Sequence, residues 1–123
     1  MTRIWFLARF GAIFGLVAAA SAAFAHAQLE KASPPVGGVV SPPTEIRLSF
    51  SEGVEPKFSG LTLKSDTGAA VTAHTAGVDP SDNKILIVKI GKPLAAGVYT
   101  VNWHAVSVDT HHTQGSFNFT VKP

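Results

Sequence analysis

Short runs in which apolar and polar residues alternate are the feature that most restricts the fold of this sequence. In residues 45–51, the apolar side chains Ile46, Leu48 and Phe50 are separated by polar ones. Side chains at every second position lie on one face of a β-strand, so this run predicts a strand with one buried and one solvated face. Further strands are predicted at residues 27–32, 58–64, 71–75, 84–90, 98–107 and 115–121.

These segments predict an all-β domain. No segment after residue 26 has apolar residues at the roughly 3.6-residue period of a helix, so the helix content is expected to be near zero. Short strands that recur every ~8–12 residues between turn residues are typical of a β-sandwich. Residues 98–107 and 115–121 are expected to form a hairpin, with residues 108–114 as its loop at one end of the sandwich.

The N-terminal 25 residues have the pattern of a secretory signal peptide. Two arginines precede an acid-free apolar run over residues 10–24, and the triplet Ala23-Phe24-Ala25 is a small-x-small cleavage site. The apolar run is short for the ~20 residues that a membrane-spanning helix needs. We therefore expect residues 1–25 to be removed and residues 26–123 to form one exported domain.

Electrostatics change once the signal peptide is set aside. The chain has 10 lysines and arginines and 8 aspartates and glutamates, and two of the basic residues lie within residues 1–25. The remaining domain is formally neutral and has no cluster of basic residues, which argues against a nucleic-acid partner. The chain has no cysteine, so the domain depends on its hydrophobic core rather than on disulfides.

Two residues near the C-terminus, Asp109 and His111, form half of a potential metal site. They are two positions apart, so on an extended backbone both side chains leave the same face. Removal of residues 1–25 would make His26 the first residue, and its α-amine and imidazole Nδ1 can chelate one ion together. Three nitrogens and one oxygen favour Cu(II), whereas Cu(I) favours sulfur ligands, and the only methionine is Met1.

Each histidine and aspartate also has an interpretation without metal. Asp109 is suited to begin a turn, and the pair His111-His112 is suited to a solvated loop. His74 is expected on the surface, and His104 on the outer face of its strand or beside the ligands. No single one of these residues indicates a metal site by itself. Their combination with a cleavage site that exposes an N-terminal histidine does.

Four segments resemble the CopC family of periplasmic copper-binding proteins. They are HAQLEKASPPVG (residues 26–37), EIRLSFSE (45–52), GVYTVNWHAVSVDTH (97–111) and GSFNF (115–119). The resemblance extends over residues 26–123, and its most specific part is W-x-x-x-S-x-D-x-H followed by G-x-F. It implies an immunoglobulin-like, cupredoxin-related Greek-key β-sandwich.

The resemblance also implies a function for this domain, which is to bind one Cu(II) ion through His26, Asp109 and His111. The chain lacks the methionines of the Cu(I) site found in some family members, so it resembles the Cu(II)-only type. A periplasmic copper carrier or buffer, active in resistance, homeostasis or import, is therefore expected. Its implied partner is an inner-membrane copper transporter of the CopD type, and we expect a monomer without enzymatic activity.

Two other functions remain open at the level of sequence. An N-terminal histidine that chelates copper resembles the copper brace of lytic polysaccharide monooxygenases, although Asp109 would fill a position that a brace leaves open. An exported structural sandwich with incidental histidines is the other alternative. The triplet Ala25-His26-Ala27 is also small-x-small, so cleavage before Gln28 would remove His26 and with it half of the site.

Overall fold

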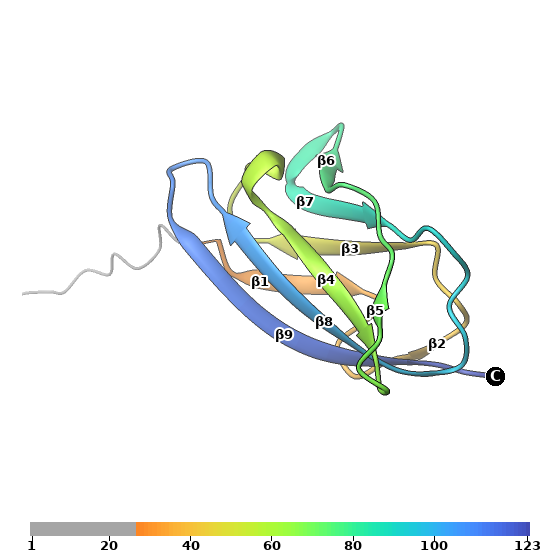
Figure 1. Ribbon diagram of the computed structural model, residues 1–123. Helices are drawn as coiled ribbons and strands as arrows, with labels where there is room; N and C mark the ends of the chain where they lie inside the picture. Colours follow the sequence, from red (N-terminus) through yellow and green to blue (C-terminus); the bar gives the residue numbers. More distant parts are fainter. Residues whose placement is uncertain (1–26) are drawn as a thin grey trace, which may run out of the picture.

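Two β-sheets pack face to face in the computed structural model, which describes residues 27–123 (Figure 1). The predicted signal peptide and His26 lie outside the described residues. The first sheet has the strand order β1-β3-β7-β6, and the second has the order β2-β9-β8-β4-β5. All neighbouring strands are antiparallel except β2 and β9, which are parallel.

The strands follow one another along the chain with short connections. Within residues 27–123, a 3-10 turn, η2, spans Pro56–Phe58, and no helix is long and apolar enough to cross a membrane. The strands are β1 (Leu29–Ser33), β2 (Val39–Val40), β3 (Glu45–Phe50), β4 (Gly60–Ser65), β5 (Ala70–Val71), β6 (Gly77–Asp79), β7 (Asp82–Lys89), β8 (Gly97–Val106) and β9 (His112–Val121).

The predicted all-β sandwich is confirmed, with differences in detail. β2 and β6 were not predicted, because strands of two and three residues show no alternation and take their pairing from β9 and β7. β9 begins at His112 rather than at residue 115, because its ladder with β8 continues as far as the pair Val106–His112. The predicted loop over residues 108–114 was therefore too long, and the true connection is five residues, 107–111.

The core lies between the two sheets and is built from the alternating positions. Ile46, Leu48 and Phe50 of β3 are 0%, 0% and 2% exposed. The ring of Phe50 meets the indole of Trp103 from the opposite sheet edge-on, with centroids 5.2 Å apart. Burial of each large apolar side chain stabilises the fold by about 1.5–3 kcal/mol, so this core holds the sandwich together without disulfides.

One end of the sandwich is fixed by contacts between the sheets. The segment that follows β3 pairs with the end of β8, since Val54 bridges Ser107 and the Glu55 N–H donates to the Val106 carbonyl at 2.8 Å. The N–H of Val108 donates to the carbonyl of Gly53 at 3.0 Å. The start of the β8–β9 connection is therefore hydrogen-bonded to the segment that follows β3.

Candidate metal centre

The connection between β8 and β9 is a tight turn that carries Asp109 and His111. The N–H of Ser107 donates to the carbonyl of His111 at 2.9 Å, and the N–H of Thr110 donates to the carbonyl of Ser107 at 2.8 Å. Thr110 has a φ of 73°, the left-handed conformation that few non-glycine residues adopt. The chain reverses within these residues and projects the two side chains from the end of the sandwich.

Asp109 and His111 are brought together as predicted from their spacing. Oδ1 of Asp109 lies 3.2 Å from Nδ1 of His111, and the side chains are 44% and 47% exposed. The contact arises from the turn rather than from the extended backbone that the spacing suggested. Two donors bound at right angles to one ion at about 2.0–2.2 Å would lie about 3 Å apart, so this separation fits two adjacent ligands of a tetragonal ion.

Ser107 is bonded to the side chain of Asp109 and to the main chain of His111, and sequence reasoning gave it no role. It is 0% exposed, its hydroxyl donates a hydrogen bond to Oδ1 of Asp109, and its Oγ accepts one from the N–H of His111 at 3.2 Å. The hydrogen bond from Ser107, followed by that from His111, lowers the pKa of Asp109 below its ordinary value of 3.8. Asp109 is therefore held as an anion with one oxygen facing the imidazole.

The N-terminal end of the described chain reaches the same end of the sandwich. Ala27 is 0% exposed, and its carbonyl accepts a hydrogen bond from the hydroxyl of Thr113 at 2.8 Å. The next residue, Gln28, is bonded to Ser51 in both directions, each time at 2.9 Å. The chain therefore enters β1 beside the first residues of β9, two positions after His111.

Within residues 27–123, no group of three or more histidine, aspartate, glutamate or cysteine side chains could hold a metal ion. The described residues thus supply a carboxylate–imidazole pair and no complete ligand set. The third predicted residue, His26, lies outside the described residues. Its neighbour Ala27 is described, and the carbonyl of Ala27 is bonded to Thr113, two positions after His111.

The remaining described histidines lie on β8, on β9 and in the segment after β5. His74 is exposed, as expected, and its N–H donates to the carbonyl of Lys89 at 2.8 Å on the other sheet. His104 and His112 are exposed on the outer face of the β8–β9 hairpin, which confirms the outer-face interpretation of His104. The imidazole of His104 lies over Gly60 of the neighbouring strand.

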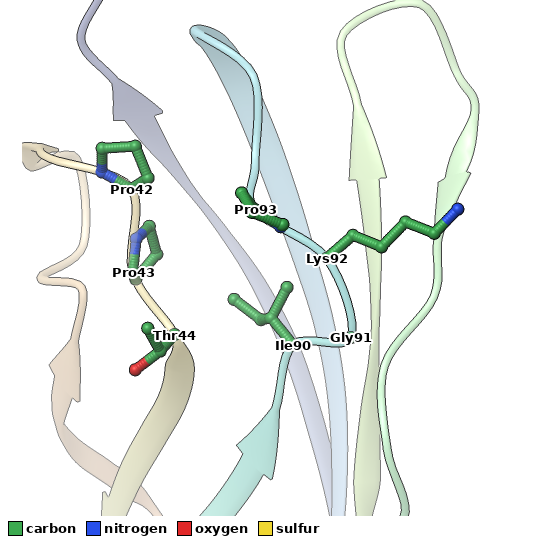
Figure 2. A pocket seen from close by; sticks show the side chains of 7 residues that line it. All are labelled: Pro42, Pro43, Thr44, Ile90, Gly91, Lys92 and Pro93. Carbon is green, nitrogen blue, oxygen red and sulfur yellow. The ribbon is translucent and has the colours of Figure 1, made fainter.

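A hollow lies beside the start of β3, at the other end of the sandwich. It is lined by prolines, one isoleucine, one threonine, one glycine and Lys92 (Figure 2). Its lining contains neither carboxylates nor imidazoles, so it has no ligands for a transition metal. The contact between Asp109 and His111 lies elsewhere, where β8 turns into β9.

Fold and site together define a class of small β-sandwiches that present a carboxylate–imidazole pair from an end loop. The CopC domain family matches residues 29–122, and the chain belongs to this family. It is 42% identical over 109 residues to copper resistance protein C of Xanthomonas campestris pv. juglandis, covering 85% of this chain and 86% of that protein.

Solved structures agree with this assignment. PcoC, described as a methionine-rich copper resistance protein from Escherichia coli, has a TM-score of 0.72 and 37% identity, covering 80% of this chain and 100% of that one. CopC from Methylosinus trichosporium OB3b has a TM-score of 0.74 and 32% identity, covering 80% of this chain and 95% of that one. Both likenesses extend over most of the described sandwich.

Proposed function

We propose that this chain is a periplasmic copper-binding protein that carries or buffers one Cu(II) ion, in copper resistance, homeostasis or import. Membership of the CopC family and the copper resistance proteins among its relatives support a role with copper. The 3.2 Å contact between Asp109 and His111 is the single observation that carries the site assignment.

The donor chemistry fits Cu(II). Asp109 supplies an oxygen, His111 an imidazole nitrogen, and His26 its α-amine and imidazole once residues 1–25 are removed. Such an oxygen and nitrogen set suits Cu(II), and the absence of cysteine and of any methionine after Met1 leaves no sulfur ligand for Cu(I). In this respect the chain differs from PcoC, which is described as methionine-rich.

The bond between Thr113 and Ala27 supports the involvement of His26. A residue directly before Ala27 would be attached to a residue whose carbonyl is already held at the start of β9. Export and cleavage would then create the second half of the site beside the first. Copper would join the new N-terminus to the β8–β9 turn, and its binding would release protons from the amine and imidazoles.

The proposal includes the cell compartment and the partner. A signal peptide over residues 1–25 would place residues 26–123 in the periplasm as one domain, and a CopD-type inner-membrane transporter would receive the copper. The protein would act as a monomer. It would have no catalytic activity, because Asp109 would occupy a position that an oxygen-activating copper brace leaves open. The neutral charge of residues 26–123 gives no basis for a nucleic-acid partner.

The test combines the mass of the exported protein with copper titration. An intact mass that corresponds to residues 26–123, together with one tightly bound Cu(II) per chain, is expected. His26→Ala and Asp109→Ala/His111→Ala should each weaken Cu(II) binding by orders of magnitude, whereas the control His74→Ala should not. The site would be refuted by an intact mass that corresponds to a chain beginning at Gln28, or by an unchanged Cu(II) affinity in His26→Ala.

A further inference from the structure

His104 and His112 are neighbours on one face of the β8–β9 hairpin. In the ladder, His104 faces Gln114 and His112 faces Val106, so the two histidines stand on a diagonal between adjacent strands. The residues on either side of His104 in sequence are buried, and both histidines are exposed. Their side chains therefore leave the sheet on its outer face, away from the core.

Both histidines line the same surface hollow of about 460 Å³. Val106 lies between them and is 8% exposed, while Phe58 of η2 borders the hollow and is 64% exposed. No lysine or arginine lines it, so no fixed positive charge opposes a cation there. The hollow combines two imidazoles with an apolar wall. Thr110, which stands between Asp109 and His111 in the sequence, also lines it, but those two residues do not.

The spacing suits one shared metal ion. Diagonal neighbours on adjacent strands are about 7–8 Å apart, and their Cβ atoms are somewhat closer. Histidines four residues apart on a helix have Cβ atoms about 5–6 Å apart and bind zinc together. The His104 ring lies over Gly60, whose position has no side chain to hold it, so rotation about its Cα–Cβ bond can carry it toward β9.

We propose that His104 and His112 form a second metal site, for a divalent late transition ion such as Cu²⁺ or Zn²⁺. Imidazole suits both ions, and water would complete the coordination because the hollow is open to solvent. With two protein ligands, this site binds more weakly than one with four donors. It shares no ligand with the site at Asp109 and His111, and it does not depend on the proposed function.

The test uses a chain from which the three predicted primary ligands are removed. His26→Ala/Asp109→Ala/His111→Ala leaves His74, His104 and His112 as the only histidines. Titration with Zn²⁺ alone, followed by the imidazole NMR signals, should shift His104 and His112 along one saturation curve at one ion per chain. The signal of His74 should not follow that curve and serves as the internal control.

Single substitutions decide whether the two histidines act together. Loss of an outer partner alone costs about 10–100-fold in metal affinity, so His104→Ala and His112→Ala should each weaken Zn²⁺ binding at least about tenfold. His74→Ala should leave the affinity unchanged. Unequal saturation curves, or a His104→Ala chain that binds as before, would overturn the proposal. In the otherwise native protein, His104→Ala should remove a second, weaker Cu²⁺ equivalent and retain the first, which separates this site from the primary one.

Discussion

The hydroxyl of Thr113 and the main-chain carbonyl of Ala27 are joined by a 2.8 Å hydrogen bond across 86 positions of the sequence. Thr113 is the second residue of β9, and Ala27 is the first residue that the structure describes. This bond links the N-terminal segment to the strand that leaves the Asp109–His111 turn. The residue that follows His26 in the sequence is therefore bonded to the strand that leaves this turn.

Thr113→Val should weaken both the fold and copper binding. Valine keeps the shape of threonine but removes the donor, so the free energy of unfolding should fall by about 0.5–1.5 kcal/mol. Cu(II) affinity should also fall, because the N-terminal segment is held less firmly near the turn. Urea denaturation and chelator competition measure the two effects. Thr120→Val is the matched control on the same strand, and equal losses in both variants would contradict this role for Thr113.

Ser107→Ala should lower Cu(II) affinity by about 10–100-fold, the usual cost of removing an outer partner of a metal ligand. The buried hydroxyl orients the carboxylate of Asp109 and accepts a hydrogen bond from the backbone of His111. Competition with a chelator of known affinity measures the change, and amide NMR spectra verify the fold. Ser116→Ala, at an exposed position of β9, is the control. An unchanged affinity in Ser107→Ala would show that the turn orients its ligands without this hydroxyl.

The sequence predicted those parts of the fold that depend on side-chain periodicity. Ile46, Leu48 and Phe50 are buried as their alternation required. β2 and the polar start of β9 could not be predicted, because their strand conformation comes from hydrogen bonding to neighbouring strands rather than from an apolar pattern.

The candidate site, like the fold, could be predicted from the sequence only in part. The proximity of Asp109 and His111 was predicted from a spacing of two residues on an extended backbone. The contact is instead made across a turn with a left-handed Thr110, which left no signal in the pattern. The roles of Ser107 and Thr113 were missed because they depend on tertiary contacts. Ser107 stands out only as a hydroxyl at the end of an apolar strand, and Thr113 was placed in a loop. A position that bonds across 86 residues cannot be recognised from its neighbours in sequence.

Asp109→Asn should weaken Cu(II) binding by a similar factor at pH 5 and at pH 7. The pKa of Asp109 is lowered from 3.8, chiefly by the Ser107 hydrogen bond, so the carboxylate is ionised throughout this range. The loss of copper on acidification must then come from protonation of the nitrogen donors, which both chains share. Affinity measurements at the two pH values check this. A difference between the two chains that shrinks at pH 5 would show that Asp109 takes up a proton there.

Asp79 should make the stability of the domain depend on pH in strong acid. Its carboxylate accepts hydrogen bonds from the hydroxyl and N–H of Ser81 and from Arg47, and these lower its pKa from 3.8 to about 2. Because the folded pKa is the lower one, the stabilisation is present above about pH 4 and is lost as the pH falls through about 2. Asp79→Asn should therefore be less stable than the native chain at pH 7, and the difference should narrow toward pH 2. Urea denaturation across this range measures it, and a constant difference would contradict the assignment.

Gly115→Ala should destabilise the sandwich through Trp103. A Cβ atom at position 115 would lie 2.6 Å from Cζ2 and 2.8 Å from Cε2 of the indole, closer than real carbon contacts allow. The indole is 8% exposed and packs edge-on against Phe50, so it cannot move aside without disturbing the core. Overpacking of this kind costs about 1–3 kcal/mol of unfolding free energy.

Urea denaturation of Gly115→Ala beside Gly77→Ala tests this packing constraint. A Cβ atom at position 77 would have no neighbour within 4 Å, and the φ of Gly77 is not positive, so alanine there should change the stability by less than about 0.5 kcal/mol. Since Gly115 follows the first residues of β9, a forced shift of Trp103 should also disturb Thr113 and lower Cu(II) affinity in the same variant. Equal stability of the two variants would show that the indole has room to move. In that case, contact with Trp103 would not explain the glycine at position 115.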